Sequence, residues 1–287
     1  MDRRVLQEAN PAPASANVVV VGAGPTGLFL ACELRLAGVN VVVLERSLEP
    51  DRTDKAHGTI GLSVRVLDNR GLLERLGRQG LPEAAPVFFY AGMPLSLALL
   101  GADNPVTLLQ VNHRELEHVL EARAAELGAD VRRGWNVTGF SQSEGGVDVV
   151  VRTAGEEDRS VTALYLVGCD GGSSIVRRQA GIGFPGSTDE HTVDRSAMIA
   201  PSEHVSHGPT LNAAINDAAN LGWKLAGAVK GWAPDTLLGT YESERHPVGE
   251  RVLMLTQAES ALMAPGPTSP PSAASSPKCS ATPAPSQ

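Results

Sequence analysis

The chain has few cysteines, few aromatic residues and no long apolar run. Its three cysteines (Cys32, Cys169 and Cys279) are too few and too scattered for a disulfide framework or a zinc site. Aromatic residues make up only 4% of the 287 residues, and the formal net charge is −8. Both values argue against nucleic-acid binding as the main function, because such binding relies on stacking platforms and on cationic contacts to phosphates.

The sequence also shows no membrane or export signal. No run approaches the roughly 18 apolar residues of a membrane span, and residues 1–16 are polar, with no apolar core of a signal peptide. We therefore expect a cytoplasmic protein with no nucleic-acid partner and no membrane partner. A hydrophobic content of 42% can fill a sizeable core, and the length predicts about two domains.

Residues 17–45 read as a complete nucleotide-binding unit. A run of four valines (Val18–Val21) ends at the sequence GAGPTG, a helical pattern follows to Gly38, and a second apolar run ends at Glu45. Strand, glycine turn, helix, strand and acid in this order are typical of a dinucleotide-binding βαβ unit. A lone glycine triplet would be weak evidence; the combination is specific.

Each polar or glycine position in this unit has a physical task. Gly22 permits the tight turn, Gly24 allows close approach of a pyrophosphate, and Gly27 allows the helix to pack against the strand. The helix start at Pro25 offers N–H groups and a positive dipole to a phosphate. Glu45 is placed to accept hydrogen bonds from ribose hydroxyls, which disfavours a 2′-phosphate and hence NADP at this position.

The rest of the chain predicts further helices and an antiparallel meander. Helices are expected over residues 62–76 (with a break at Gly71), 112–128, 173–180, 212–229 and 235–264, the last broken near Pro247. Short strands are expected at residues 106–110 and 131–133. The meander uses residues 137–141, 147–153 and 161–167.

A second motif lies at the end of the last predicted strand, where Asp170 and Gly171 follow an apolar run. An Asp-Gly pair alone is usually only a turn, but Ser173, Ser174, Arg177 and Arg178 follow it. Together with the glycine turn, Glu45-Arg46, residues 65–73, the run NLGWKLA (220–226) and the run ERHP (244–247), this segment resembles the FAD-dependent aromatic hydroxylases. The resemblance is to the single-component flavoproteins related to p-hydroxybenzoate hydroxylase, in the bacterial polyketide-hydroxylase branch, and covers most of residues 18–253.

The resemblance implies a cofactor site. The Gly22, Gly24 and Gly27 turn would hold the FAD pyrophosphate, Glu45 the ribose, and Arg46 would lie near the adenine. Further predicted contacts to the ribityl-phosphate chain and the flavin ring come from the remaining family positions: Gln110, Arg114, Asp170, Gly171, Leu211 and Asn212. No catalytic side chain and no metal ligand is predicted. His191, His204 and His207 match no zinc spacing and are expected to be exposed loop residues.

The resemblance also implies a fold and a reaction. The expected fold is α/β, a Rossmann-like FAD-binding fold with a parallel central sheet and a small antiparallel meander. NAD(P)H would reduce the flavin, O₂ would form a flavin hydroperoxide, and one oxygen atom would enter a small aromatic or polyketide-like substrate. The cofactor supplies this chemistry, so the lack of a catalytic triad or metal cluster does not count against it.

Two departures from the family pattern shape the expected domains. Family members place a substrate-binding domain and a second flavin-binding Gly-Asp motif where only a shortened linker, residues 187–210, stands here. The family C-terminal region is replaced by residues 264–287, which hold seven prolines and six serines and are expected to be disordered. The predicted order of segments begins with a flexible N-terminus (residues 1–16) and the first part of the FAD-binding domain (residues 17–186). The linker and the helices of the FAD-binding domain (residues 211–263) follow.

Three functional hypotheses follow. The first is an NAD(P)H- and FAD-dependent monooxygenase, and the second is a truncated, inactive FAD-binding remnant. The third is a plain NAD-dependent dehydrogenase, which the Asp-Gly run and the meander argue against. The sequence leaves the choice between turnover and an inactive remnant open.

Overall fold

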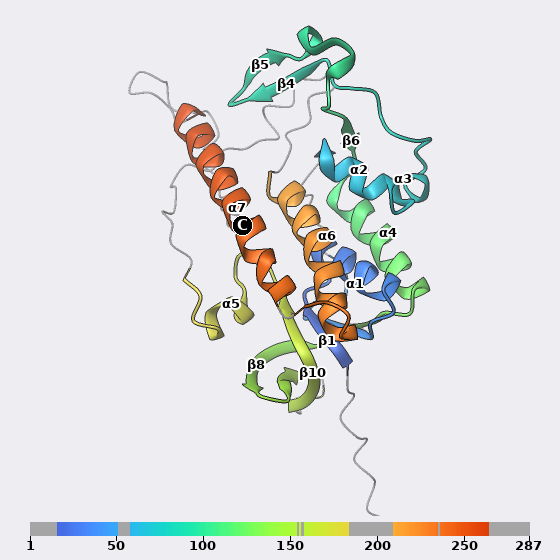
Figure 1. Cartoon of the computed structure of the whole chain (residues 1–287), viewed down its shortest axis with the longest axis vertical. Coiled ribbons are helices and arrows are strands. Elements are labelled where there is room, and N and C mark those ends of the chain that lie inside the picture. The colour runs from blue at the N-terminus through green and yellow to red at the C-terminus, as the bar shows by residue number, and fades with distance from the viewer. Residues whose placement is uncertain are drawn as a thin grey trace, which may run out of the picture.

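A computed structural model describes residues 16–50, 58–153, 155, 158–183, 209–234 and 236–263; in residues 209–210 it describes the backbone only. In Figure 1 a bundle of helices lies beside the sheet that contains β1, β8 and β10. The N-terminal residues 1–15, most of the predicted linker (187–208) and the predicted tail (264–287) lie outside the described residues, as do His191, His204 and His207.

The central sheet has six strands in the order β7-β2-β1-β10-β9-β8. Its first four strands are parallel, and the two inner strands β1 and β2 are runs of buried apolar residues, as expected for strands covered on both faces. The parallel strands are β1 (Ala16–Val21), β2 (Val41–Glu45), β7 (Asp130–Arg133) and β10 (Asp158–Gly168). This confirms the predicted parallel sheet.

The predicted meander is also confirmed, and it forms a second layer. It consists of β8 (Asn136–Ser143), β9 (Gly146–Arg152) and the first half of β10. The second half of β10 pairs with β1, with Ala16 opposite Ala163 and Val21 opposite Gly168. One long strand therefore belongs to both parts and carries Asp170 to the edge where β1 ends.

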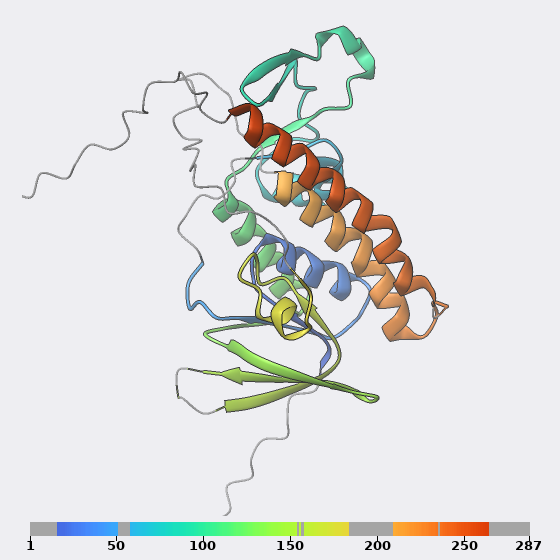
Figure 2. The same cartoon turned by 90° about the vertical axis from the view of Figure 1, so that its left-hand side faces the viewer.

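Helices cover the other face of the parallel strands, as Figure 2 shows. Alternate β1 residues divide the core: Val18 and Val20 pack with the helices, whereas Val19 and Val21 pack with the meander. The longer helices are α1 (Pro25–Leu36), α4 (His113–Glu126), α6 (Pro209–Lys230) and α7 (Thr236–Met263). Asn112 begins α4 as predicted, because its Oδ1 accepts a 2.7 Å bond from the Glu115 amide.

The remaining elements are short. The predicted break at Gly71 is confirmed, because its φ of +66° separates two helices. These elements are β3 (Gly58–Ile60), α2 (Leu62–Asp68), α3 (Leu72–Arg75), β4 (Val87–Tyr90), β5 (Met93–Ser96), the 3₁₀ helix η1 (Ala98–Asp103), β6 (Leu108–Gln110) and α5 (Ile175–Gln179).

The structure differs from the sequence-based expectation at Pro247 and in the elements that were not predicted, which are β3, η1 and the hairpin β4–β5. The last helix is not broken near Pro247, which lies inside a continuous α7; a proline removes one backbone donor without ending a helix when the turns on both sides persist. The hairpin β4–β5 was not predicted, because it has no fully buried residue and shows no apolar alternation. No helix in the described part of the chain is long and apolar enough to cross a membrane.

Candidate cofactor site

The parallel strands end at one edge of the sheet, and the predicted nucleotide-binding residues follow there. Gly22 comes directly after β1, Glu45 is the last residue of β2, and Asp170 follows β10 by two residues. A 2.7 Å bond from the Cys169 amide to the Val21 carbonyl holds the ends of β10 and β1 together. Ligands of open α/β sheets bind at this carboxyl edge.

The three turn glycines have different tasks. Gly22 has a φ of +104°, and a Cβ on it would lie 2.4 Å from the Cys169 carbonyl oxygen. A Cβ on Gly27 would lie 2.0 Å from the Gly22 carbonyl oxygen, so the first turn of α1 packs directly on the loop. A Cβ on Gly24 would meet nothing within 4 Å, so its face is open.

The start of α1 fits an anionic group. Gly24 is the N-cap residue, no side chain caps the helix, and no acidic residue lies in its first turn. The first N–H groups of a helix have no partner within the helix and carry the positive end of its dipole. A pyrophosphate can therefore approach the open Gly24 face and receive these N–H groups.

Glu45 links the glycine turn to the second strand. Its Oε2 accepts a 2.8 Å bond from the Ala23 amide, and its Oε1 accepts a 2.8 Å bond from the Ser47 amide. A carboxylate has about four acceptor positions, so each oxygen keeps capacity for a ribose hydroxyl. Arg46 is exposed beside it.

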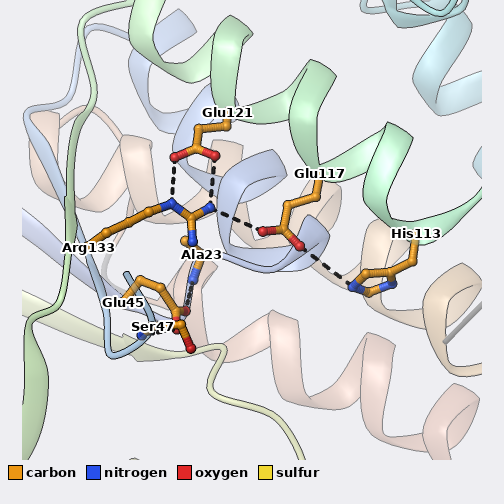
Figure 3. Close-up of polar contacts among 7 residues, drawn as sticks. All are labelled: Ala23, Glu45, Ser47, His113, Glu117, Glu121 and Arg133. Atoms are coloured by element: carbon orange, nitrogen blue, oxygen red, sulfur yellow. Dashed lines mark hydrogen bonds and ion pairs between the residues drawn. The ribbon is translucent and has the colours of Figure 1, made fainter. Parts of the chain in front are cut away.

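A charged cluster that the sequence analysis missed surrounds the end of β7 (Figure 3). Arg133 Nε and Nη2 donate to both oxygens of Glu121 at 2.9 and 2.8 Å, and Nη2 also donates to Glu117 at 3.1 Å. His113 Nε2 lies 3.9 Å from the other Glu117 oxygen. Burial raises the pKa of Glu117, and the bonds to Glu121 raise the pKa of Arg133. In the sequence, the only signal for this charged cluster is the i, i+4 spacing of the two glutamates on α4.

Asp170 organises the turn after β10. Its Oδ2 accepts bonds of 2.7 and 3.3 Å from the Ile175 and Val176 amides at the start of α5, whose N-cap residue is Ser174. Its Oδ1 is buried and has no hydrogen-bond partner among the described residues, so it has capacity for a ligand hydroxyl. Gly171 has a φ of +75°. The neighbouring thiol is no nucleophile, because burial raises the pKa of Cys169 to about 12.

The residues predicted for the flavin end form a second group, joined through β3. Gln110 is exposed and pairs with Gly58. The next strand residue, Thr59, donates a 2.6 Å bond to Asn212 Oδ1, which also accepts from the Ile60 amide at 2.9 Å. The Asn212 side-chain oxygen therefore anchors α6 to β3. Leu211 is buried, and Arg114 is exposed in the first turn of α4.

The two C-terminal motifs bind each other. Asn220 and Lys224 on α6 both contact Glu244 on α7, each at 2.8 Å, and Arg245 pairs with Asp217 at 2.6 Å. A Cβ on Gly222 would lie 2.6 Å from the Glu33 Cβ, so α6 crosses α1 closely. These contacts fix α6 against the helix that follows the glycine turn. In the described part of the chain no group of three or more His, Cys, Asp or Glu residues is placed to hold a metal ion.

Comparison with known proteins identifies the family. A protein family described as "FAD binding domain" matches two segments of this chain, residues 15–211 and 202–256. The chain is 34% identical to rifampicin monooxygenase of Streptomyces venezuelae, over 88% of this chain and 73% of that protein. It is 32% identical to 12-dehydrotetracycline 5-monooxygenase/anhydrotetracycline 6-monooxygenase of Streptomyces rimosus, over 88% and 70%. The solved structure of OxyS anhydrotetracycline hydroxylase from Streptomyces rimosus superposes with a TM-score of 0.72 at 31% identity, covering 87% of this chain and 69% of that one.

The chain is shorter than these relatives. The match to rifampicin monooxygenase spans 352 aligned positions, but 88% of 287 residues is only about 253 residues, so about 99 positions have no residue of this chain opposite them. The glycine turn, Glu45 and Asp170 lie within the first matched segment, and α6 with most of α7 within the second. The chain therefore belongs to the FAD-dependent aromatic hydroxylase family and is a shortened member of it.

Proposed function

We propose that this chain binds FAD at the carboxyl edge of its parallel sheet and uses NAD(P)H and O₂ to insert one oxygen atom into a small aromatic or polyketide-like molecule. The observation that carries the proposal is the open Gly24 face at the uncapped start of α1, with Glu45 bonded directly to the same turn. This arrangement suits a pyrophosphate followed by a ribose. FAD, when bound, supplies the redox and oxygen chemistry.

The protein groups bind and orient. The N–H groups at the start of α1 would hold the pyrophosphate, and Glu45 would accept bonds from the ribose hydroxyls. A 2′-phosphate beside this carboxylate would meet like charge, which favours FAD over an NADP-type nucleotide here. The buried Asp170 Oδ1 would accept a hydroxyl of the ribityl chain. Arg46, Arg114, Gln110 and Gly171 are proposed contacts on family grounds.

The proposed substrate class comes from the relatives, whose names refer to rifampicin, 12-dehydrotetracycline and anhydrotetracycline. In this chain the part that would enclose such a substrate would be reduced to the predicted linker. The two family matches meet at residues 202–211, at the end of the predicted linker (187–210), which supports a deletion of the substrate-binding domain there. Pro209 begins α6 and has no N–H to offer to a flavin ring.

These observations are the reason to keep a second candidate function, an FAD-binding protein that does not hydroxylate. Both candidates share the site for the ADP half of FAD and differ only in turnover. In that case NAD(P)H oxidation would be absent or would yield only hydrogen peroxide.

One experiment separates these outcomes. The purified protein is examined for flavin absorbance, stripped, titrated with FAD, and then mixed with NADH or NADPH and a panel of phenols and tetracycline-type polyketides. Flavin binding with a product one oxygen atom heavier supports the monooxygenase. Binding with no oxygenated product supports the non-hydroxylating protein. Absence of flavin before and after titration contradicts both.

A further inference from the structure

Arg133 and Glu45 are neighbours that would be expected to pair. They are register partners at the ends of two adjacent parallel strands, β7 and β2. Register partners point to the same face of a sheet, and an arginine beside a carboxylate forms a strong bidentate pair when geometry allows. Such a pair would occupy the oxygens that Glu45 needs for a ribose.

The structure shows a different pairing. Arg133 turns toward α4, where Glu121 binds it through two parallel bonds and Glu117 through a third (Figure 3). The side chains of Arg133 and Glu117 are 16% and 5% exposed, so these charges are poorly screened. Burial is the main cause of the raised pKa of Glu117, and the charge of Glu45 adds to it. Figure 3 shows Glu45 beside this cluster.

We propose that Glu117 and Glu121 are positioning residues for the nucleotide site: they hold Arg133 on α4 and thereby keep Glu45 available to the ribose of FAD. The inference rests on the proposed function, because it assumes that FAD binds at Glu45. It adds residues of α4 and β7, two elements outside the glycine-turn unit, to those that shape the ribose site.

The bonds at Glu45 support this role. Its two oxygens hold the Ala23 and Ser47 amides, which fixes the carboxylate at the turn while leaving lone pairs for hydroxyl donors. A guanidinium arriving from Arg133 would compete for those lone pairs with the geometry that carboxylates bind best. Arg133 binds α4 because two carboxylates are available there, whereas β2 offers only that of Glu45.

The test is the change in FAD affinity caused by Glu121→Gln, measured by quenching of flavin fluorescence during titration of the apoprotein. Glu117 remains as a counter-ion, so Arg133 is not left buried without a partner. We expect FAD to bind about tenfold more weakly, within the range of couplings between residues of one charged network. Glu121→Asp keeps the charge and should retain most of the affinity.

Two further variants make the result specific. In a Glu45→Ala background, Glu121→Gln should change FAD affinity less than twofold, because the group through which it acts is gone. Glu126→Gln is the matched control: it is the same change on the same helix, and it weakens a bidentate pair with Arg75 and a bond from Arg123 without contact to Arg133. It should leave FAD affinity unchanged.

The outcomes separate the two levels of the argument. Wild-type protein that binds no FAD overturns the proposed function and this inference together. Wild-type binding with unchanged affinity in Glu121→Gln overturns the inference alone. An equal loss of affinity in the Glu45→Ala background, or an equal loss in Glu126→Gln, shows a purely structural role and also overturns it.

Discussion

Gly27 and Gly24 lie three residues apart in the same turn, and alanine at each should fail for a different reason. A Cβ on Gly27 would lie 2.0 Å from the Gly22 carbonyl oxygen, whereas real Cβ contacts are not seen below 3.0 Å. The start of α1 must then shift by about 1 Å relative to the loop. Because the obstructing atom belongs to the backbone, the cost lies at the upper end of overpacking, about 3 kcal/mol.

Gly24→Ala should behave in the opposite way. Its Cβ would meet nothing within 4 Å, and its φ of −73° suits any residue. The cost to folding is about 1 kcal/mol or less, from a poorer N-cap. The added methyl group instead occupies the open face where the pyrophosphate would approach, so FAD should bind at least about tenfold more weakly.

Thermal unfolding and FAD titration of both variants check this reasoning. For a chain of this size, Gly27→Ala should lower Tm by about 6–12 °C, and Gly24→Ala by no more than about 4 °C. Gly239→Ala is the control, because a Cβ there also meets nothing within 4 Å and alanine favours the α7 interior. A wild-type Tm in Gly27→Ala, or unchanged FAD affinity in Gly24→Ala, would refute the assigned roles.

Further predictions concern the ion pair of Arg70 with Glu33, the Cys169 thiol and the turn after β10. Arg70→Met should lower the unfolding free energy by about 3 kcal/mol in urea titrations, because it leaves the buried Glu33 carboxylate unpaired; an unchanged midpoint would contradict this. Since burial raises the pKa of Cys169 to about 12, the folded state keeps a proton that the unfolded thiol loses near pH 9, so this thiol's contribution to stability should fall as pH rises from about 9 to 12. The difference between wild type and Cys169→Ala across that range measures it, and a flat difference would argue against burial. Asp170→Ala should cost about 1 kcal/mol through the lost bonds to the first two amides of α5 and weaken FAD retention, whereas Asp158→Ala, which removes an exposed pair with Arg152, should do neither.

The local elements could be read from the sequence because their signals are local. Four buried valines, a glycine turn and a capping Asn112 each favour one backbone conformation through contacts within a few residues. The structure confirms the resulting strands and helices near the expected positions. The prediction of a helix break at Pro247 was wrong because the outcome depends on the turns flanking the proline. The β4–β5 hairpin was missed because its strands make few buried contacts. Tyr90 and Ala91 donate hydrogen bonds to acceptors on α7 that lie more than 160 positions away in the sequence.

The candidate site divides in the same way. The sequence by itself determined the nucleotide-binding unit, because Gly22, Gly24, Gly27 and Glu45 lie within one βαβ segment whose spacing fixes their geometry. Only the tertiary structure decided what surrounds that unit. The tertiary structure holds the turn of Asp170 at the end of β1 and bonds the Asn212 side chain to β3. It also places Arg133 next to Glu45 in the sheet while the Arg133 side chain binds α4. The physical reason is that sheet register and helix packing bring distant charges together, and which charges pair depends on distances that no local pattern encodes.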